Sequence, residues 1–255
     1  MKQLSLFYSI IILLLSFENG YSQCIGAIPN SDWDLLIRHK PELSISNAAA
    51  ARNRPVLSIY NGIGDVNLDY WAITISKMPI VNGRRLTAEQ LLSRIRGRFS
   101  TYIDRSLAVF SPSQPLDEPA WRAGTVGALL TFTIKVPTIP GPTSVIAPVM
   151  LSASTPTYWR FVTVGQHPVS GSREFGIRNL PDGKWEVYTR GADRISSRHS
   201  VPMTHMIFEG GDQIWEKFQD KVGQDITSIG GEVSNYPETH GRYCWSSIIS
   251  RIPLQ

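Results

Sequence analysis

The sequence predicts an α+β fold in which an antiparallel β-sheet wraps against a long C-terminal helix. Three features favour this fold. Several segments alternate apolar and polar residues, a tight-turn sequence joins two of them, and an amphipathic helical pattern follows near the C-terminus. The 255-residue chain is 42% hydrophobic and 18% charged, which argues against disorder throughout. Its one uninterrupted apolar run lies at the N-terminus, which excludes a polytopic membrane protein.

Residues 1–22 are expected to be a secretory signal peptide. Lys2 supplies a positive charge, residues 4–17 are almost wholly apolar, and Gly20 and Ser22 place small residues at the two positions that a signal peptidase recognises. The apolar segment has roughly 14 residues, fewer than the ~20 that a membrane-spanning helix needs. The mature chain, residues 23–255, is therefore expected to be a single α+β domain that is secreted or periplasmic.

Two cysteines, Cys24 and Cys244, lie near the two ends of the expected mature chain. In an oxidising compartment such a pair favours a disulfide. One alternative is a nucleophilic thiol at Cys244 served by His240. Another is lipidation at Cys24, which is disfavoured because Gln23 is bulky where the lipoprotein pattern has Gly or Ala.

The best helix candidate in the first half begins at a capping box. Thr87 and Gln90 have the spacing at which each side chain caps the other's backbone N–H, and an apolar stripe at helical spacing follows. In chain order, the first half is expected to form a short helix over 34–38, irregular chain over 44–69, a strand over 70–78, a helix over 87–104 and a proline-rich connector over 110–119.

The clearest local structure in the second half is a hairpin. The turn sequence Leu180-Pro181-Asp182-Gly183 presets one φ angle with Pro and accepts a positive φ at Gly183. Gly230-Gly231 is expected to end the long helix. The remaining elements are expected to be strands over 129–136, 145–152 and 159–164, the hairpin strands over 173–179 and 184–190, a helix beginning at Asp212, and a last strand over 245–252.

One motif carries a family resemblance. The stretch His167-Pro168-x-Ser170-Gly171-x-x-x-Phe175 is similar to a segment in an uncharacterised bacterial branch of the START-like and polyketide-cyclase-like helix-grip proteins. The motif covers about 30 residues with the strand that follows it, and the element order extends the resemblance to about 160. It implies an apolar cavity between sheet and helix that holds a hydrophobic or amphipathic small molecule.

Tryptophans and one polar cluster are the candidate ligand-binding residues. Aromatic side chains can line such a cavity, although in any folded domain they can equally form its core. Two arginines around one aspartate can bind an anion in bidentate geometry, or the aspartate can simply pair with an arginine where the strand ends. The candidate ligand-binding residues are Trp71, Trp159, Trp185, Trp215, Arg190, Asp193 and Arg194.

A second polar cluster follows the strand over 159–164. His167 is a candidate acid or base and Arg173 a candidate anion site, with Ser170 and Glu174 beside them. The alternative is an ordinary turn with solvated charges. If these residues are catalytic, the alternative function is a secreted hydrolase or a nuclease-like effector that uses His167 together with Arg190, Asp193 and Arg194.

The sequence indicates no cofactor and no metal. The spacings of His199, His205 and His240 fit no zinc template, even with Asp193 and Asp212. The arginines at positions 94, 98 and 105 share one helix face, which can meet nucleic acid or anionic lipid or can simply be solvated. A net charge of +4 is too small to decide, so there is no strong nucleic-acid signal. The oligomeric state stays open.

Overall fold

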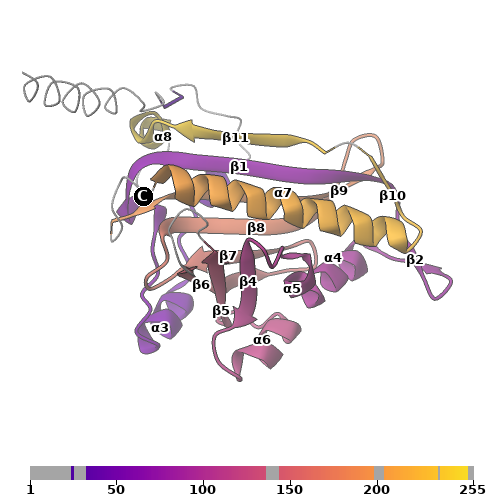
Figure 1. Cartoon of the computed structure of the whole chain (residues 1–255), viewed down its shortest axis with the longest axis horizontal. Helices are drawn as coiled ribbons and strands as arrows, with labels where there is room; N and C mark the ends of the chain where they lie inside the picture. The colour runs from indigo at the N-terminus through magenta and orange to yellow at the C-terminus, as the bar shows by residue number, and fades with distance from the viewer. Residues whose placement is uncertain (1–23, 26–32, 136–143, 198–203, 235, 252–255) are drawn as a thin grey trace, which may run out of the picture.

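The structure, a computed structural model, describes residues 24–25, 33–135, 144–197, 204–234 and 236–251. The expected signal peptide lies outside these residues. A nine-stranded antiparallel sheet runs in the order β10-β1-β9-β8-β7-β6-β5-β4, and β11 also pairs with β1 (Figure 1). Its strands are β1 Gly62–Lys77, β4 Ala108–Pro112, β5 Leu129–Lys135, β6 Ser144–Ser154, β7 Tyr158–Thr163, β8 Val169–Asn179, β9 Trp185–Ser196, β10 Glu232–Ser234 and β11 Glu238–Tyr243. Short strands β2 Ile80–Val81 and β3 Arg84–Arg85 form a separate hairpin.

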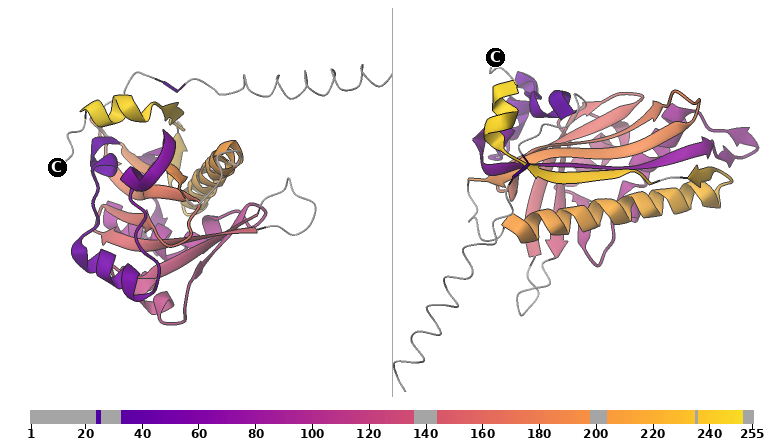
Figure 2. Two further views of the ribbon diagram at one scale, coloured as in Figure 1. Left: turned by 90° about the vertical axis from the view of Figure 1, so that its left-hand side faces the viewer. Right: turned by 90° about the horizontal axis from the view of Figure 1, so that it is seen from above.

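The long helix α7, Thr204–Ser228, runs nearly parallel to β1, β8 and β9, and the strands curve around it (Figures 1 and 2). We call the side of the sheet that faces α7 the helix face. The helix packs there because Ile214, Phe218, Val222 and Ile226 recur every four residues and are buried in the main core. This arrangement confirms the predicted α+β class, an antiparallel sheet wrapped against a long C-terminal helix.

An aromatic cluster fills the helix face beyond α7. Three short helices pack against this cluster: α4 Ala88–Gly97, α5 Phe99–Tyr102 and α6 Asp117–Ala123. Phe99 is fully buried, and its ring contacts those of Phe110, Trp121, Phe132, Trp159, Phe161, Phe175 and Phe218. The contacts make Phe99 the centre of the core.

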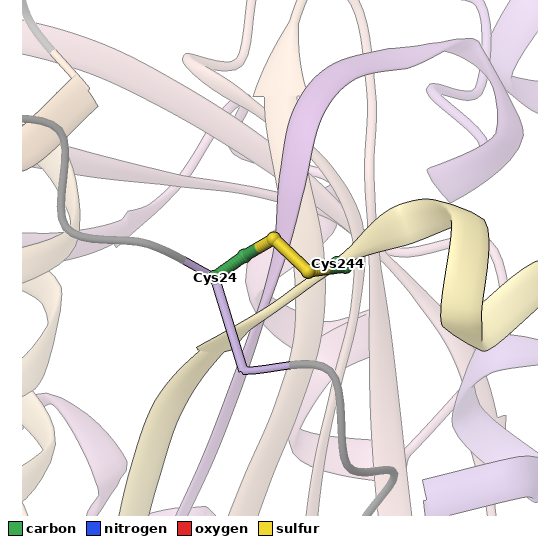
Figure 3. The surroundings of a disulfide bond; sticks show 2 residues. All are labelled: Cys24 and Cys244. Carbon is green, nitrogen blue, oxygen red and sulfur yellow. A yellow bond between two sulfur atoms is a disulfide. The ribbon is translucent and has the colours of Figure 1, made fainter.

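The opposite side of the sheet, which we call the outer face, is also covered. Helices α2 Asp34–Ile37 and α8 Trp245–Arg251 pack there around a second buried cluster, and α3 Leu43–Ala51 packs against a third. The second cluster contains Trp33, Leu36, Ile37, Val66, Leu68, Ala192 and Ile248. A Cys24–Cys244 disulfide joins the N-terminal segment to the residue before α8 (Figure 3). The predicted pairing is therefore present in the structure.

Two local predictions are confirmed. Thr87 Oγ1 accepts a hydrogen bond from the Gln90 backbone N–H, and the Gln90 side chain accepts one from the Thr87 N–H. In the β8–β9 hairpin, Gly183 has φ +79° and donates a backbone hydrogen bond to the Leu180 carbonyl. Both motifs depend on a few adjacent residues, so tertiary packing does not override them.

Four element boundaries differ from the predictions. The helix over 87–104 is interrupted at Arg98, whose ψ of 11° ends α4 and starts α5. The region 44–69 is not irregular, because it holds α3 and the first eight residues of β1. Helix α7 begins at Thr204, so Asp212 lies inside it and does not cap it. The connector over 110–119 contains the end of β4 and the start of α6.

The tail over 245–252 is a helix, α8, and not a strand over its described residues. Trp245 and Ile248 are three residues apart and meet the same outer-face cluster, which is helical spacing. The strand that pairs with β1 precedes them as β11. Among the described residues, no helix is long and apolar enough to cross a membrane.

Candidate functional site: a cavity under the long helix

A cavity lies between the N-terminal half of α7 and the helix face of the sheet. The space open to water-sized molecules is about 90 Å³, and the cavity is partly open to solvent. Most of its wall is apolar. Side chains from β5, β6, β7 and α7 supply this part, including Phe132, Val149, Phe161, Phe208, Ile214 and Trp215. Such a wall suits an apolar ligand body.

Five polar residues of the cavity wall lie on neighbouring strands and on α7. Asn67 and Asp69 come from β1, Arg173 from β8, Asp193 from β9 and Asp212 from α7. In the sheet register, Asn67 is directly opposite Asp193, and Asp69 is opposite Gly191. Side chains two residues apart on one strand share a face, so Asp69 and Asp193 are diagonal neighbours.

An ion pair bridges the strands on either side of Gly191. Arg173 Nη2 lies 2.5 Å from Asp69 Oδ2, and the Asn67 amide donates to the same oxygen at 3.0 Å. A Cβ at Gly191 would lie 2.3 Å from Arg173 Nη2, so the missing side chain makes room for this pair. Trp215 covers the guanidinium, whose carbon lies 4.3 Å from the ring centre.

Burial and like charge shift the acidity of two carboxyls. Burial, with Asp69 nearby, raises the pKa of Asp193 well above its usual range. Burial and the same neighbour raise the pKa of Asp212 to about 6. Asp69, Asp193 and Asp212 each keep one buried oxygen without a hydrogen-bond partner among the described residues. This acidic end is the least satisfied part of the cavity wall.

Of the residues considered for a metal, His240 and Asp212 lie near each other. His240 Nδ1 is 3.7 Å from Asp212 Oδ2, and its ring stacks on Trp71 at 5.8 Å. His199 and the side chain of His205 lie outside the described residues. In the described part of the chain, no three His, Cys, Asp or Glu side chains are grouped as metal ligands.

The period-two geometry of β8 separates the cluster that begins at His167. His167 and Arg173 line the cavity. His167 sits in the turn before β8, where its Nδ1 lies 3.1 Å from the Val169 backbone N–H. Ser170 and Glu174 are buried on the outer face, so the four candidate residues do not form one site.

Strand β9 separates the second cluster in the same way. Asp193 faces the cavity, whereas Arg190 and Arg194 face outward. Arg190 pairs with Glu174 at 2.7 Å, and Arg194 stacks over Trp245 of α8. The two arginines therefore hold the outer face together and do not reach the cavity.

Glu174 is the centre of a buried outer-face network. It accepts hydrogen bonds from Arg160, Arg190 and Tyr188. Arg160 also contacts His39 Nδ1 at 2.9 Å. Burial, with Arg160 nearby, lowers the pKa of His39 to about 4. The network ties the segment after α2 to the sheet.

The four candidate tryptophans occupy different places. Trp215 lines the cavity, and Trp159 stacks on Phe175 inside the aromatic core. Trp71 lies beside His240, and Trp185 is half-buried near the hairpin turn. Trp185 and Trp215 both contact the main core without making a ring pair in the described residues. The structure thus brings Trp215, and not the other three, to the cavity.

Asn67 and Asp69 line the cavity but were not among the predicted site residues. They share the helix face with Trp71 because residues 67, 69 and 71 alternate along β1. Extending the predicted strand toward its N-terminus would have placed both on the side of Trp71. Arg94 of α4 and Arg98, which lies between α4 and α5, have a structural role. Arg94 and Arg98 both pair with Asp225 of α7.

No protein-family model matches the sequence, and no curated protein matches it. Solved structures do resemble the chain. The DR_A0006 protein of Deinococcus radiodurans is 16% identical, covers 64% of this chain and 99% of its own, and gives a TM-score of 0.40. Ara h 8.0201 is 11% identical, with 62% and 97% covered and a TM-score of 0.38. The di-domain ARO/CYC StfQ of the steffimycin biosynthetic pathway is 6% identical, with 64% and 51% covered and a TM-score of 0.39. Similarity this distant assigns no function to the chain.

Proposed function

We propose that the protein is a secreted or periplasmic domain, formed by residues 23–255, that binds a hydrophobic or amphipathic small molecule in the cavity under α7. The observation that carries the proposal is the composition of the wall, which is apolar over most of its area and polar at one end. Such a wall favours a ligand with an apolar body and one polar group. The N-terminal signal pattern and the disulfide support the compartment.

The alternative is a hydrolase or nuclease-like effector that uses His167 with Arg190, Asp193 and Arg194. That chemistry needs the histidine and the two arginines around one substrate. Because Arg190 and Arg194 lie on the outer face, the geometry favours binding over this form of catalysis.

An uncharged apolar dye such as N-phenyl-1-naphthylamine tests the proposal. The dye is expected to fluoresce with wild-type protein and to be displaced by alkyl compounds. Ile207→Trp adds an indole at the half-buried edge of the cavity and is expected to lower dye affinity by about tenfold. The matched control Val109→Trp places the same ring on exposed β4. Equal dye binding by the two folded variants would refute the cavity as the binding site.

A further inference from the structure

We propose that the ligand carries a protonated amine, and that its ammonium group lies at the acidic end of the cavity, facing Asp69, Asp193 and Asp212. The inference rests on the proposed function and names the chemical class of its ligand. Two independent observations carry it: the charge balance at this end of the cavity and the unpartnered oxygens on its wall.

The first observation is that carboxyl groups outnumber basic side chains. Among the described side chains, three carboxyl groups at this end face two guanidiniums, those of Arg173 and Arg242. Arg242 of β11 also lies within the influence of the more exposed Asp65 and Glu209. The other titratable neighbours are His240, beside Asp212, and His167 on the wall. Because burial beside Asp69 disfavours a charge on Asp193, a ligand cation at this end would stabilise its ionised form.

The second observation is the pair of buried oxygens on β1 and β9. Asp69 is 1% exposed and Asp193 is 8% exposed, and the Oδ1 atom of each lacks a hydrogen-bond partner among the described residues. An unpaired buried acceptor costs about 1–3 kcal/mol, and more when charged. An alkylammonium has three N–H donors, so one group can serve several acceptors.

Two features favour an organic cation over other ligands. The carboxylates do not cluster as metal ligands in the described residues, and the adjoining wall is apolar. An anionic head group finds Arg173 already paired with Asp69 and covered by Trp215. Arg242 packs over Phe208 and faces acidic neighbours. The wall thus fits an amine with an alkyl or aromatic body.

Three ligands of equal chain length test the inference: decylamine, decanol and decanoate. The affinity of each is measured by its displacement of the uncharged dye from the intact protein near pH 7, where the amine is protonated. Decylamine is expected to bind about tenfold more tightly than decanol, and decanoate more weakly than both. Equal affinities, or a preference for decanoate, would overturn the ammonium inference while leaving the proposed function in place. If none of the three displaces the dye, both the proposed function and the inference fail.

Variants locate the ammonium. Asp193→Asn is expected to reduce the preference for decylamine over decanol to about twofold, with decanol affinity kept. Asp212→Asn, at a less buried position, is expected to reduce this preference in part. It provides a second measurement if Asp193→Asn does not fold. Asp182→Asn in the β8–β9 turn removes the same charge at an exposed site and is the matched control. An unchanged preference in folded Asp193→Asn and Asp212→Asn would refute the placement.

Discussion

Replacing Glu174 with glutamine tests whether the outer-face network holds the fold. The carboxylate is 2% exposed and accepts hydrogen bonds from Arg160, at 3.1 and 2.5 Å, and from Arg190, at 3.1 and 2.7 Å. The Tyr188 hydroxyl donates a further bond at 2.9 Å. Glutamine keeps the volume but turns an amide toward two guanidiniums and removes their shared counter-charge.

The expected loss is about 3–5 kcal/mol, the range for removing one partner of a buried ion pair. For a domain of this size, that loss corresponds to a decrease in Tm of about 6–20 °C. Calorimetry and urea unfolding measure it. The control Glu118→Gln removes an exposed pair with Arg122, and is expected to cost about 0–1 kcal/mol.

The pH dependence supplies a second readout. Burial would raise the pKa of Glu174, but Arg190 and Arg160 outweigh it and hold the pKa below its usual range. The ionised group therefore adds stability above its unfolded pKa of about 4.3, and this part is lost as the pH falls through the lowered folded pKa. The difference between wild type and Glu174→Gln is expected to be constant near pH 7 and to shrink in acid. A variant as stable as the control that has lost dye binding would refute a structural role.

Three further predictions concern the scaffold. Reducing the Cys24–Cys244 disulfide, which spans 220 residues, is expected to lower the Tm in calorimetry by the equivalent of at most about 5 kcal/mol. An unchanged Tm would show that the disulfide does not stabilise the fold. Phe99→Ala is expected to cost about 3–5 kcal/mol in urea unfolding because it opens the centre of the aromatic core, and a loss below about 1 kcal/mol would contradict that placement. Thr87→Ala removes one half of the capping box and is expected to cost about 1 kcal/mol in the same assay, with the exposed Ser93→Ala inside α4 as a control.

Local signals predicted the fold best where a few adjacent residues determine the geometry. The turn at Gly183 needs a positive φ, and the capping box needs Thr87 and Gln90 three residues apart. The apolar stripe of α7 appears in the sequence because one side of that helix meets the sheet along its length. These signals were enough to predict an antiparallel sheet and a long C-terminal helix.

Elements whose structure depends on distant partners were predicted less well. The first half of β1 alternates Asn67 and Asp69 with buried Val66 and Leu68, so both faces are buried and the usual contrast between apolar and polar residues disappears. The helix α8 is short, and its packing depends on Trp33, which is more than 200 residues away. Neither the burial of both faces of β1 nor the packing of α8 on Trp33 can be inferred from neighbouring residues.

The candidate site was partly predictable for the same reason. His167, Arg173, Asp193 and Trp215 were candidates and do line the cavity. Their grouping with other residues was based on nearness in sequence, which alternation along a strand does not preserve. Asp69 was not predicted because its partner Arg173 is two strands away. The two side chains meet over Gly191 of the strand between them, which has no side chain to separate them.

Both faces of the sheet are covered, but the buried carboxyl groups on the two faces are hydrogen-bonded to different extents. On the outer face, Glu174 meets two guanidiniums, and both of its oxygens are hydrogen-bonded. On the helix face, Asp69 and Asp193 lie diagonally on paired strands and each keeps an unpartnered buried oxygen among the described residues. Buried charge that serves the fold alone is expected to be fully paired, because each unpaired group costs stability. On the helix face the unpartnered carboxyl oxygens of Asp69 and Asp193 also line a cavity, which makes this cavity the place to look for a ligand.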